Sequence, residues 1–318
     1  MENIKKIRIP YWDNIKGLLI ILVVVGHLLE TLPEGQLGAI YKFIYLFHMP
    51  LFIFVSGYLA KFNLKKSIKN FLIPYLIIQP ICCFITGNPV TLTTPFWILW
   101  YLLSLFIWYL SIPLLDRLPV RKRPIFIVLC ILFACVVGYK DSIGYFASLS
   151  RTIVFFPYFV IGYYTKYYYT KHKNDNFLNR NKYIVKVFIC ALVCLVIGTF
   201  IYKSSNINAK WLYGAYSYTF ANYTILFRLL HYAMAITIGT FVLIFIPQKT
   251  NILTEIGKNS FKIYLTHMII VPAVKYIVLN IHTTTFILEV LCIIIGFLYC
   301  KGLVDCNNYI KKRFSLSF

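Results

Sequence analysis

The chain has 318 residues, of which 60% are hydrophobic and only 13% are charged, and its mean hydropathy is +0.74. A soluble domain is about half apolar and about a quarter charged, so this composition excludes an ordinary soluble protein. The formal net charge of +22 also occurs in nucleic-acid-binding proteins, and the distribution of the charge along the chain therefore decides what it means.

Ten apolar segments follow one another along the chain, each about long enough to cross ~30 Å of hydrocarbon as a helix. We expect them at residues 14–32, 41–60, 71–87, 96–115, 124–139, 152–169, 183–202, 223–246, 260–280 and 284–303. The sequence therefore predicts an all-α, polytopic integral membrane protein with about ten transmembrane helices. Because the connecting segments are short, we expect residues 1–318 to form a single transmembrane domain with no appended soluble domain.

Basic residues are concentrated in alternate connecting segments. If the N-terminus is cytoplasmic, most of the 32 lysines and arginines face inward, and the outward segments carry only Lys42, Lys140, Arg151, Lys203 and Lys210. This alternation follows the positive-inside rule and predicts that both termini are cytoplasmic. We expect a multi-pass protein of the plasma or inner membrane that contacts lipids, and we expect no nucleic-acid partner.

The nine cysteines include no C-x-x-C pair and no metal-ligand spacing with histidine. We expect them to serve as small apolar side chains, and we expect no bound metal. The outward segment before residue 223 is rich in aromatic residues: Trp211, Tyr213, Tyr216 and Tyr218. Such rings can stack on sugars or form a belt at the membrane interface, and both interpretations stay open.

The first apolar segment contains ionisable residues that lipid disfavours. Lys16 and His27 are eleven helical steps apart, which brings them to one face at a separation of ~16 Å along the axis. Lys16 could be a snorkelling anchor at the cytoplasmic helix end. His27 lies deeper, in the outer half of the membrane, and is harder to explain as an anchor. Glu30 is predicted to orient the imidazole, although it also suits the outer helix end.

Four further polar residues fall at about the depth of His27 and are predicted to bind substrate: His48, Arg228, His231 and Glu289. We expect Arg228 and Glu289 to form an ion pair, since either charge alone in hydrocarbon would be costly. The polar residues of the ninth segment are interpreted as structural: Lys262, His267 and Lys275.

A basic cluster is expected at the cytoplasmic surface, where Lys16 would lie near Lys65, Lys66 and Lys69. Lysines bind phosphates but also meet anionic lipid headgroups. Coenzyme A carries its phosphates roughly 15–20 Å from its thioester, similar to the ~16 Å between Lys16 and His27. We therefore predict that these four lysines hold acyl-CoA.

Five motifs occur in order along the chain: Lys16 and His27 separated by ten residues, FHMPLFIFVSGYL (Phe47–Leu59), LWYLLSLFIW (Leu99–Trp108), FFPYFVIGYY (Phe155–Tyr164) and NSFKIYLTH (Asn259–His267). With these motifs the chain resembles the membrane-bound acyltransferase 3 family, and within it the fucose 4-O-acetylase type of polysaccharide O-acetyltransferase. The resemblance spans nearly the whole length. From the third motif we add Trp100 to the predicted substrate-binding residues.

The resemblance implies acetyl-CoA as the acyl donor, a glycan acceptor on the far side of the membrane, His27 as the central catalytic residue and Lys16 as a donor-binding residue. Two departures from the family pattern are evident. The family's basic motif is often arginine-rich, whereas Lys66-x-x-Lys69 stands here, and lysine lacks the bidentate fork that grips phosphate. Some members also carry an extracytoplasmic hydrolase-like domain, for which we expect no counterpart.

We expect a membrane O-acyltransferase that moves an acyl group, in the first place acetyl, from cytosolic acyl-CoA to a hydroxyl of a cell-envelope or extracellular glycan or lipid-linked sugar. His27 would be the general base in direct transfer, with an acyl-histidine intermediate as the alternative. His48, Arg228 or His231 would stabilise the oxyanion. The competing class is a transporter or flippase for a lipid-linked sugar or small metabolite, with His27 as a proton relay.

Overall fold

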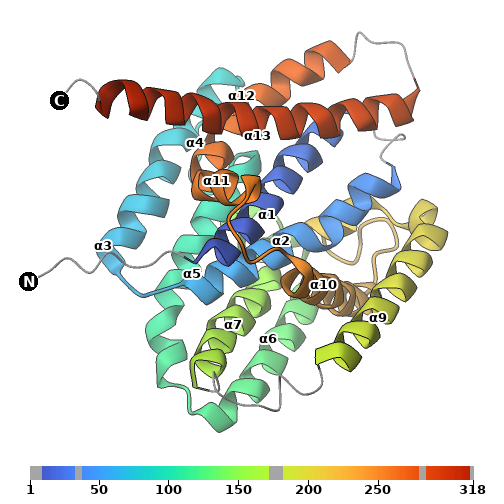
Figure 1. The fold of residues 1–318 in the computed structure, drawn as a ribbon. Helices are drawn as coiled ribbons and strands as arrows, with labels where there is room; N and C mark the ends of the chain where they lie inside the picture. The colour runs from blue at the N-terminus through green and yellow to red at the C-terminus, as the bar shows by residue number, and fades with distance from the viewer. Residues whose placement is uncertain (1–8, 33–37, 172–181, 279–283, 316–318) are drawn as a thin grey trace, which may run out of the picture. The chain divides into compact units, whose positions relative to one another are not determined.

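The computed structural model describes residues 9–32, 38–171, 182–278 and 284–315, and all regular secondary structure in these ranges is helical. The main helices are α1 (Pro10–Leu29), α2 (Ala39–Leu59), α3 (Leu64–Ser67), a π-helical turn (Ile68–Leu72), α4 (Ile73–Ile85), α5 (Trp100–Arg117), α6 (Arg123–Val137), α7 (Leu149–Lys171), α9 (Lys182–Lys203), α10 (Ile225–Phe245), α11 (Ile252–Lys258), α12 (Ser260–Val278) and α13 (Thr285–Ser315). Labels follow Figure 1. The predicted all-α class is confirmed.

Seven helical stretches in the described ranges are long and apolar enough to cross a membrane: Pro10–Leu29, Ala39–Leu59, Leu64–Ile85, Trp97–Arg117, Phe146–Tyr168, Ile225–Phe245 and Thr285–Arg313. The protein is therefore polytopic. The other three predicted segments coincide with helices α6, α9 and α12, which are not among these seven stretches. The count of ten and the cytoplasmic termini stay predictions.

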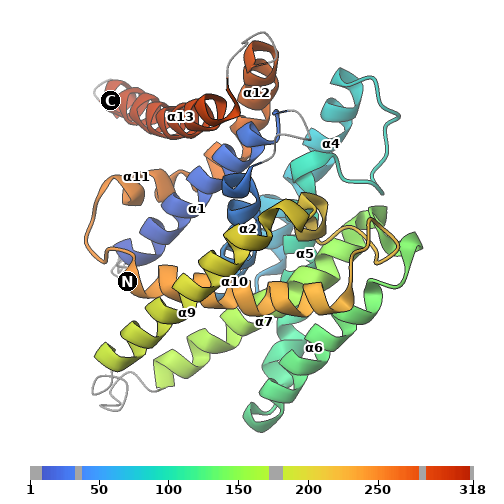
Figure 2. The same ribbon diagram turned by 90° about the vertical axis from the view of Figure 1, so that its right-hand side faces the viewer.

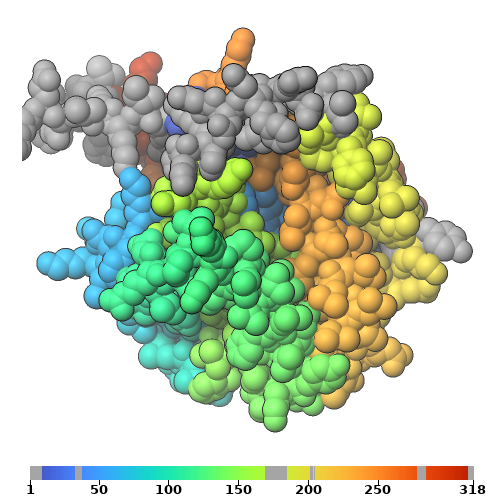
Figure 3. Space-filling model, turned by 90° about the horizontal axis from the view of Figure 1, so that it is seen from below, coloured from blue at the N-terminus to red at the C-terminus, as the bar shows by residue number. Residues whose placement is uncertain are grey.

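The helices expose much apolar surface, as expected for contact with lipid. Helix α6 is the clearest case, and its exposed side chains are Ile125, Val128, Leu129, Leu132, Phe133 and Val136. Figure 3 shows this green part of the chain lying uncovered. In water such a surface would drive association, whereas hydrocarbon chains cover it without cost.

The chain divides into two compact units. The first comprises Met1–Met49, Phe188–Ile201 and Thr237–Phe318, and the second comprises Pro50–Val187 and Tyr202–Ile236. The chain passes from one unit to the other inside helices α2, α9 and α10. The single-domain expectation stays a prediction.

Helix α1 is central to the first unit, where it packs against α11, α12 and α13; Figure 1 shows α11 beside α1. Glycines permit the closest approach. A Cβ atom on Gly257 of α11 would overlap the Asp13 carbonyl, and one on Gly17 of α1 would overlap the Leu253 carbonyl. The backbones of the two helices therefore touch, an approach that only glycine allows.

Replacing Gly257 by alanine is expected to lower the free energy of unfolding by ~1–3 kcal/mol, because the new methyl group meets backbone rather than a movable side chain. Gly302→Ala is the matched control, since nothing lies within 4 Å of a Cβ atom at that helical position. Thermal unfolding of the purified variants in detergent measures both. Equal midpoints for the two variants would contradict the close packing of α1 on α11.

The second unit is organised around α5 and α7. Ser104 Oγ lies 2.7 Å from Thr152 Oγ1, and the Trp108 indole donates to the Thr152 carbonyl at 2.9 Å. Tyr164 donates to the Leu115 carbonyl at 3.0 Å. Helix α6 packs along α7, as Figure 2 also shows. These buried hydrogen bonds satisfy polar groups for which lipid offers no partner.

Candidate functional site

The His27 side chain lies at the end of α1 and faces a carboxylate. His27 Nδ1 is 2.9 Å from Oε2 of Glu30, the residue that caps the helix. Positions three apart on a helix share a face, so the pair follows from local geometry. The side chains are 17% and 28% exposed. The pair is therefore neither sealed in the core nor fully open to solvent.

Tyr45 of α2 contacts both His27 and Glu30 through its hydroxyl group. Its hydroxyl lies 3.2 Å from His27 Nδ1 and donates to Glu30 Oε2 at 3.4 Å. Gly26 makes this approach possible, because a Cβ atom there would lie 3.0 Å from Cε2 of Tyr45. His48, one turn further along α2, packs edge-on against Tyr45 with ring centroids 4.9 Å apart.

His267 of α12 stacks on His27, with ring centroids 5.3 Å apart and an interplanar angle of 23°. The His267 side chain is fully buried, and its Nδ1 lies 3.2 Å from the Ile263 carbonyl. Five residues from three helices of the first unit thus come together, and we call them the histidine cluster: His27, Glu30, Tyr45, His48 and His267.

The hydrogen bonds of the cluster assign tautomers. His48 Nδ1 lies 2.7 Å from the Ile44 carbonyl, so it must carry the proton, and the same logic applies to His267. A carboxylate beside His27 Nδ1 likewise favours a proton there, which makes Nε2 the basic nitrogen. Among the described residues, no group of three or more His, Cys, Asp or Glu side chains is arranged to hold a metal ion.

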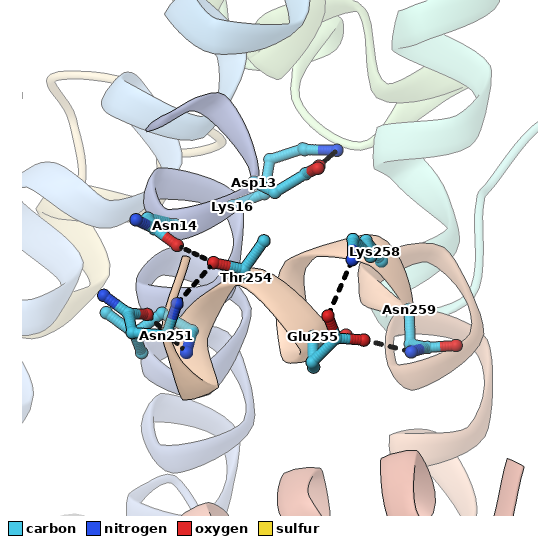
Figure 4. Close-up of polar contacts among 9 residues, drawn as sticks. Asp13, Asn14, Lys16, Asn251, Thr254, Glu255, Lys258 and Asn259 are labelled. Atoms are coloured by element: carbon cyan, nitrogen blue, oxygen red, sulfur yellow. Dashed lines mark hydrogen bonds and ion pairs between the residues drawn. The ribbon is translucent and has the colours of Figure 1, made fainter. Parts of the chain in front are cut away.

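Lys16 lies at the other end of α1 and is paired with Asp13. The Nζ to Oδ1 distance is 2.7 Å, and the side chains are 20% and 3% exposed (Figure 4). Lys16 therefore has a third role that the sequence did not suggest, which is to neutralise a buried carboxylate. Its predicted role in donor binding stays a proposal.

Asn14 fastens the same end of α1 to α11 and the chain before it. Its Nδ2 donates to the carbonyls of Pro247 at 2.7 Å and Lys249 at 2.9 Å, and its Oδ1 accepts from Thr254 at 2.5 Å. Thr254 also accepts from the Asn251 backbone N–H within the capping box that begins α11 (Figure 4). This network holds α1, and hence His27, in a defined orientation within the first unit.

Lys65, Lys66 and Lys69 lie in the second unit on α3 and the π-helical turn that follows it, and all three are exposed. Asn63 caps this segment by accepting from the Lys66 N–H at 2.9 Å. Because Lys16 belongs to the first unit, a common donor-binding mouth for the four lysines stays a prediction.

An ion pair was expected at Arg228 because an unpartnered charge in hydrocarbon is costly, but the structure shows that this charge has other partners. This guanidinium, 1% exposed, donates to the Tyr223 hydroxyl at 3.0 Å and to the carbonyls of Ala134 at 2.8 Å and Tyr216 at 3.0 Å. It also stacks on Tyr218 and Tyr223. Carbonyl and phenol oxygens of the second unit satisfy the cation, so a carboxylate partner is not required. Arg228 therefore joins α10 to α6 and to the preceding loop.

The other predicted substrate-binding residues are placed as follows. His231 is buried on α10 of the second unit, and Glu289 is buried on α13 of the first. The Glu289 carboxylate lies against Gly38, and its Oε1 has no hydrogen-bond partner among the described residues. Trp100 begins α5 in the second unit and stacks on Phe155 at 5.5 Å. The ion pair between Arg228 and Glu289 stays a prediction.

Two members of the histidine cluster were not among the site residues predicted from the sequence. Tyr45 is three residues before His48 and so shares its helical face, a signal that the sequence offered. His267 was interpreted as structural, although it closes the NSFKIYLTH motif. Its stacking on His27 depends on how α12 packs against α1, which no local pattern reveals.

The acyltransferase domain family model matches residues 9–304, and the chain belongs to this acyltransferase 3 family. Together with the apolar helices, this match makes the protein a membrane acyltransferase. It is similar to the nodulation protein NolL of Sinorhizobium fredii, with 46% identity over 61 residues, which are 18% of this chain and 17% of that protein. It is also similar to NolL of Mesorhizobium japonicum, with 50% identity over 54 residues, 15% of this chain and 14% of that protein.

These matches span less than a fifth of the length of the curated relatives. No solved structure matches the chain. The family assignment therefore rests on the family model.

Proposed function

We propose that the protein transfers an acetyl group from cytosolic acetyl-CoA to a hydroxyl of a cell-envelope or extracellular glycan in the plasma or inner membrane, with His27 as the general base. The observation that carries this proposal is the 2.9 Å contact between His27 Nδ1 and Glu30 Oε2, at the end of a membrane helix in a chain of an acyltransferase family. A carboxylate at Nδ1 fixes the tautomer and supports the positive charge that forms when Nε2 takes a proton.

The proposed reaction is direct transfer. His27 Nε2 removes the proton from a sugar hydroxyl while the hydroxyl oxygen attacks the thioester carbonyl carbon. The tetrahedral intermediate then collapses, the C–S bond breaks, and the CoA sulfur receives the proton from the imidazolium. The products are an O-acetyl sugar and free CoA. Glu30 stabilises the imidazolium, and the His267 ring keeps the imidazole plane oriented.

Stabilisation of the oxyanion requires N–H or O–H groups that are not already committed. The His48 Nδ1 proton is engaged by the Ile44 carbonyl, and a neutral ring has no second N–H to offer. The Tyr45 hydroxyl borders His27, and its hydrogen bond to Glu30 is long at 3.4 Å, so it would have to give up that bond to serve as the oxyanion donor of the first unit. The oxyanion roles of Arg228 and His231, which belong to the second unit, stay predictions from the sequence.

On the donor side, helix α1 runs without interruption from Pro10 to Leu29, so Lys16 and His27 stand ~16 Å apart along its axis. A CoA phosphate at Lys16 would compete with the Asp13 carboxylate for the ammonium group. Lys65, Lys66 and Lys69 are exposed in the second unit, and their predicted role in binding the phosphates stays a proposal. The donor's thioester would then lie beside His27.

The test uses the intact protein in proteoliposomes, with acetyl-labelled acetyl-CoA and glycan extracted from the cell envelope of the source organism. We expect labelled O-acetyl groups on the glycan and one CoA thiol released for each group. If the protein is instead a transporter, a sugar should move across the bilayer with no release of CoA thiol. Sugar movement without acetylation would contradict the proposal, and protein-free liposomes control for spontaneous hydrolysis.

A further inference from the structure

Three loops at one end of the second unit are tied to one another. They comprise residues 86–99, 138–149 and 204–224, and the positive-inside rule predicts that all three face outward. Ala147 N donates to the Thr93 carbonyl at 2.5 Å, and Tyr218 N donates to the Gly138 carbonyl at 2.8 Å. Figure 2 shows the loop before α7 beside the loop before α10. The loops therefore form one connected surface.

The loops are held in specific conformations. Among the residues that the structure describes, every non-glycine residue with positive φ lies in them: Trp97, Ala147, Ser148, Ala221 and Asn222. Left-handed backbone at non-glycine residues is unfavourable and persists only where the surroundings enforce it, most often at functional sites. A belt of rings that merely meets lipid needs no such definition of the backbone.

Aromatic rings line this surface, and they surround a cation. Trp100 and Tyr145 both stack on the Arg151 guanidinium, with centroids 5.3 Å and 5.1 Å from its carbon. Tyr145 lies edge-on to Tyr216 at 5.9 Å. We call the whole group the aromatic platform: Trp100, Tyr145, Arg151, Lys210, Tyr213, Tyr216 and Phe220. Each member is at least partly exposed.

The second half of the platform also combines rings with positive charge. Tyr216 packs on Phe220 at 4.4 Å and on Tyr213 at 6.3 Å, while the Lys210 ammonium group lies 6.0 Å from the Phe220 centroid. Asp141 is the acidic residue at the edge of these loops. Hydrogen bonds from Ser217 and Thr219 lower the pKa of its carboxyl, so it stays ionised and already has partners.

From this arrangement we infer that the aromatic platform binds the acceptor, and that Arg151 selects a glycan containing an acidic sugar. Aromatic faces pack against the apolar faces of pyranose rings, and a guanidinium edge bonds a carboxylate in bidentate fashion. Stacking uses the face of the guanidinium and carboxylate binding uses its edge, so both can operate at once. The inference rests on the proposed function, because it names the substrate class of that reaction.

The test measures binding to the purified full-length protein in nanodiscs, without acetyl-CoA. The two probes are a glucuronate-containing tetrasaccharide and the same compound with its carboxyl groups reduced to alcohols. We expect the acidic probe to bind at least ~10-fold more tightly than the neutral one, the discrimination that a bidentate charge-assisted contact supplies. Arg151→Gln should remove this preference, and Tyr145→Leu should weaken both probes by ~5-fold or more.

The matched control is Tyr139→Leu. Tyr139 is 62% exposed in the same loops, but it packs against Tyr218 at 4.8 Å and does not belong to the platform, so binding should not change. Equal binding of both probes by wild type, or an Arg151→Gln variant that still discriminates, would overturn the inference. Failure of both probes to bind would favour a lipid belt and overturn it as well.

Failure of the aromatic platform and failure of the proposed reaction can be distinguished by experiment. Acidic glycan that binds but is never acetylated would overturn the reaction and keep the platform. Acetylation with an unchanged KM for the acceptor in Arg151→Gln and Tyr145→Leu would keep the reaction and overturn the platform.

Discussion

Replacing His27 by glutamine is expected to lower the turnover number for acetyl transfer by ~10²–10⁴-fold, the contribution typical of a general base. The amide keeps a polar contact for Glu30 Oε2, which lies 2.9 Å from Nδ1 in the wild type, but it cannot accept the hydroxyl proton. Binding of acetyl-CoA should stay within about twofold, because the proposed donor contacts lie ~16 Å away at Lys16. Initial rates of labelled acetyl transfer, with donor binding measured separately, give both quantities.

One control checks that His27→Gln folds, and a second variant tests how much the neighbouring ring contributes. The thermal unfolding midpoint and elution volume of His27→Gln should match those of the wild type. His267→Phe keeps an aromatic ring against His27 but removes the ring nitrogens. Its turnover number should fall less than about tenfold, because even complete loss of an aromatic pair costs only ~0.5–1.5 kcal/mol. A properly folded His27→Gln variant with turnover within about fivefold of wild type would rule out the general-base role.

Replacing Glu30 by glutamine is expected to lower the turnover number by ~10–100-fold, with little change in the KM for acetyl-CoA. The amide preserves the shape of the side chain and an acceptor for His27 Nδ1, but it removes the negative charge that stabilises the imidazolium in the transition state. Glu30 acts through His27 and is a positioning residue. Partners that orient a metal-ligating histidine contribute ~10–100-fold, and we expect a similar effect for a catalytic histidine. Steady-state kinetics with the donor varied separates turnover from KM.

The conservative variant Glu30→Asp tests whether charge or packing matters. It retains the carboxylate and should recover part of the activity that Glu30→Gln loses. If both variants lose the same activity and also unfold at lower temperature, Glu30 only ends the helix, which was the alternative role inferred from the sequence. Equal activity of Glu30→Gln and wild type would remove the carboxylate from the mechanism.

The helices were largely predictable because lipid imposes a simple requirement. A segment that crosses hydrocarbon must be apolar and helical over its whole length, so hydropathy marks it without knowledge of neighbours. Helices α1 and α2, for example, lie within a few residues of the predicted segments. Boundaries at polar ends differ more: α13 runs on to Ser315, beyond the predicted end at residue 303, because a helix continues into water when no residue stops it.

The site was predictable only where it depends on position along one helix. The contact of His27 with Glu30 follows from a spacing of three, whereas the contacts with Tyr45 and His267 depend on helix packing. The depth of Arg228 in the membrane suggested a carboxylate partner. Depth alone does not show that backbone carbonyls and a phenol already accept hydrogen bonds from its guanidinium. Lys16 shows the same limit, because its pair with Asp13 was available locally yet was not weighed against donor binding.

The most direct test of the central claim is a single-turnover measurement with labelled acetyl-CoA and glycan, run on wild type and His27→Gln in matched proteoliposomes. For the wild type we expect label on the glycan with stoichiometric CoA thiol, and for the variant we expect the label to remain on acetyl-CoA. Transfer of label to the glycan at the wild-type rate by His27→Gln would contradict the role of His27 as the general base.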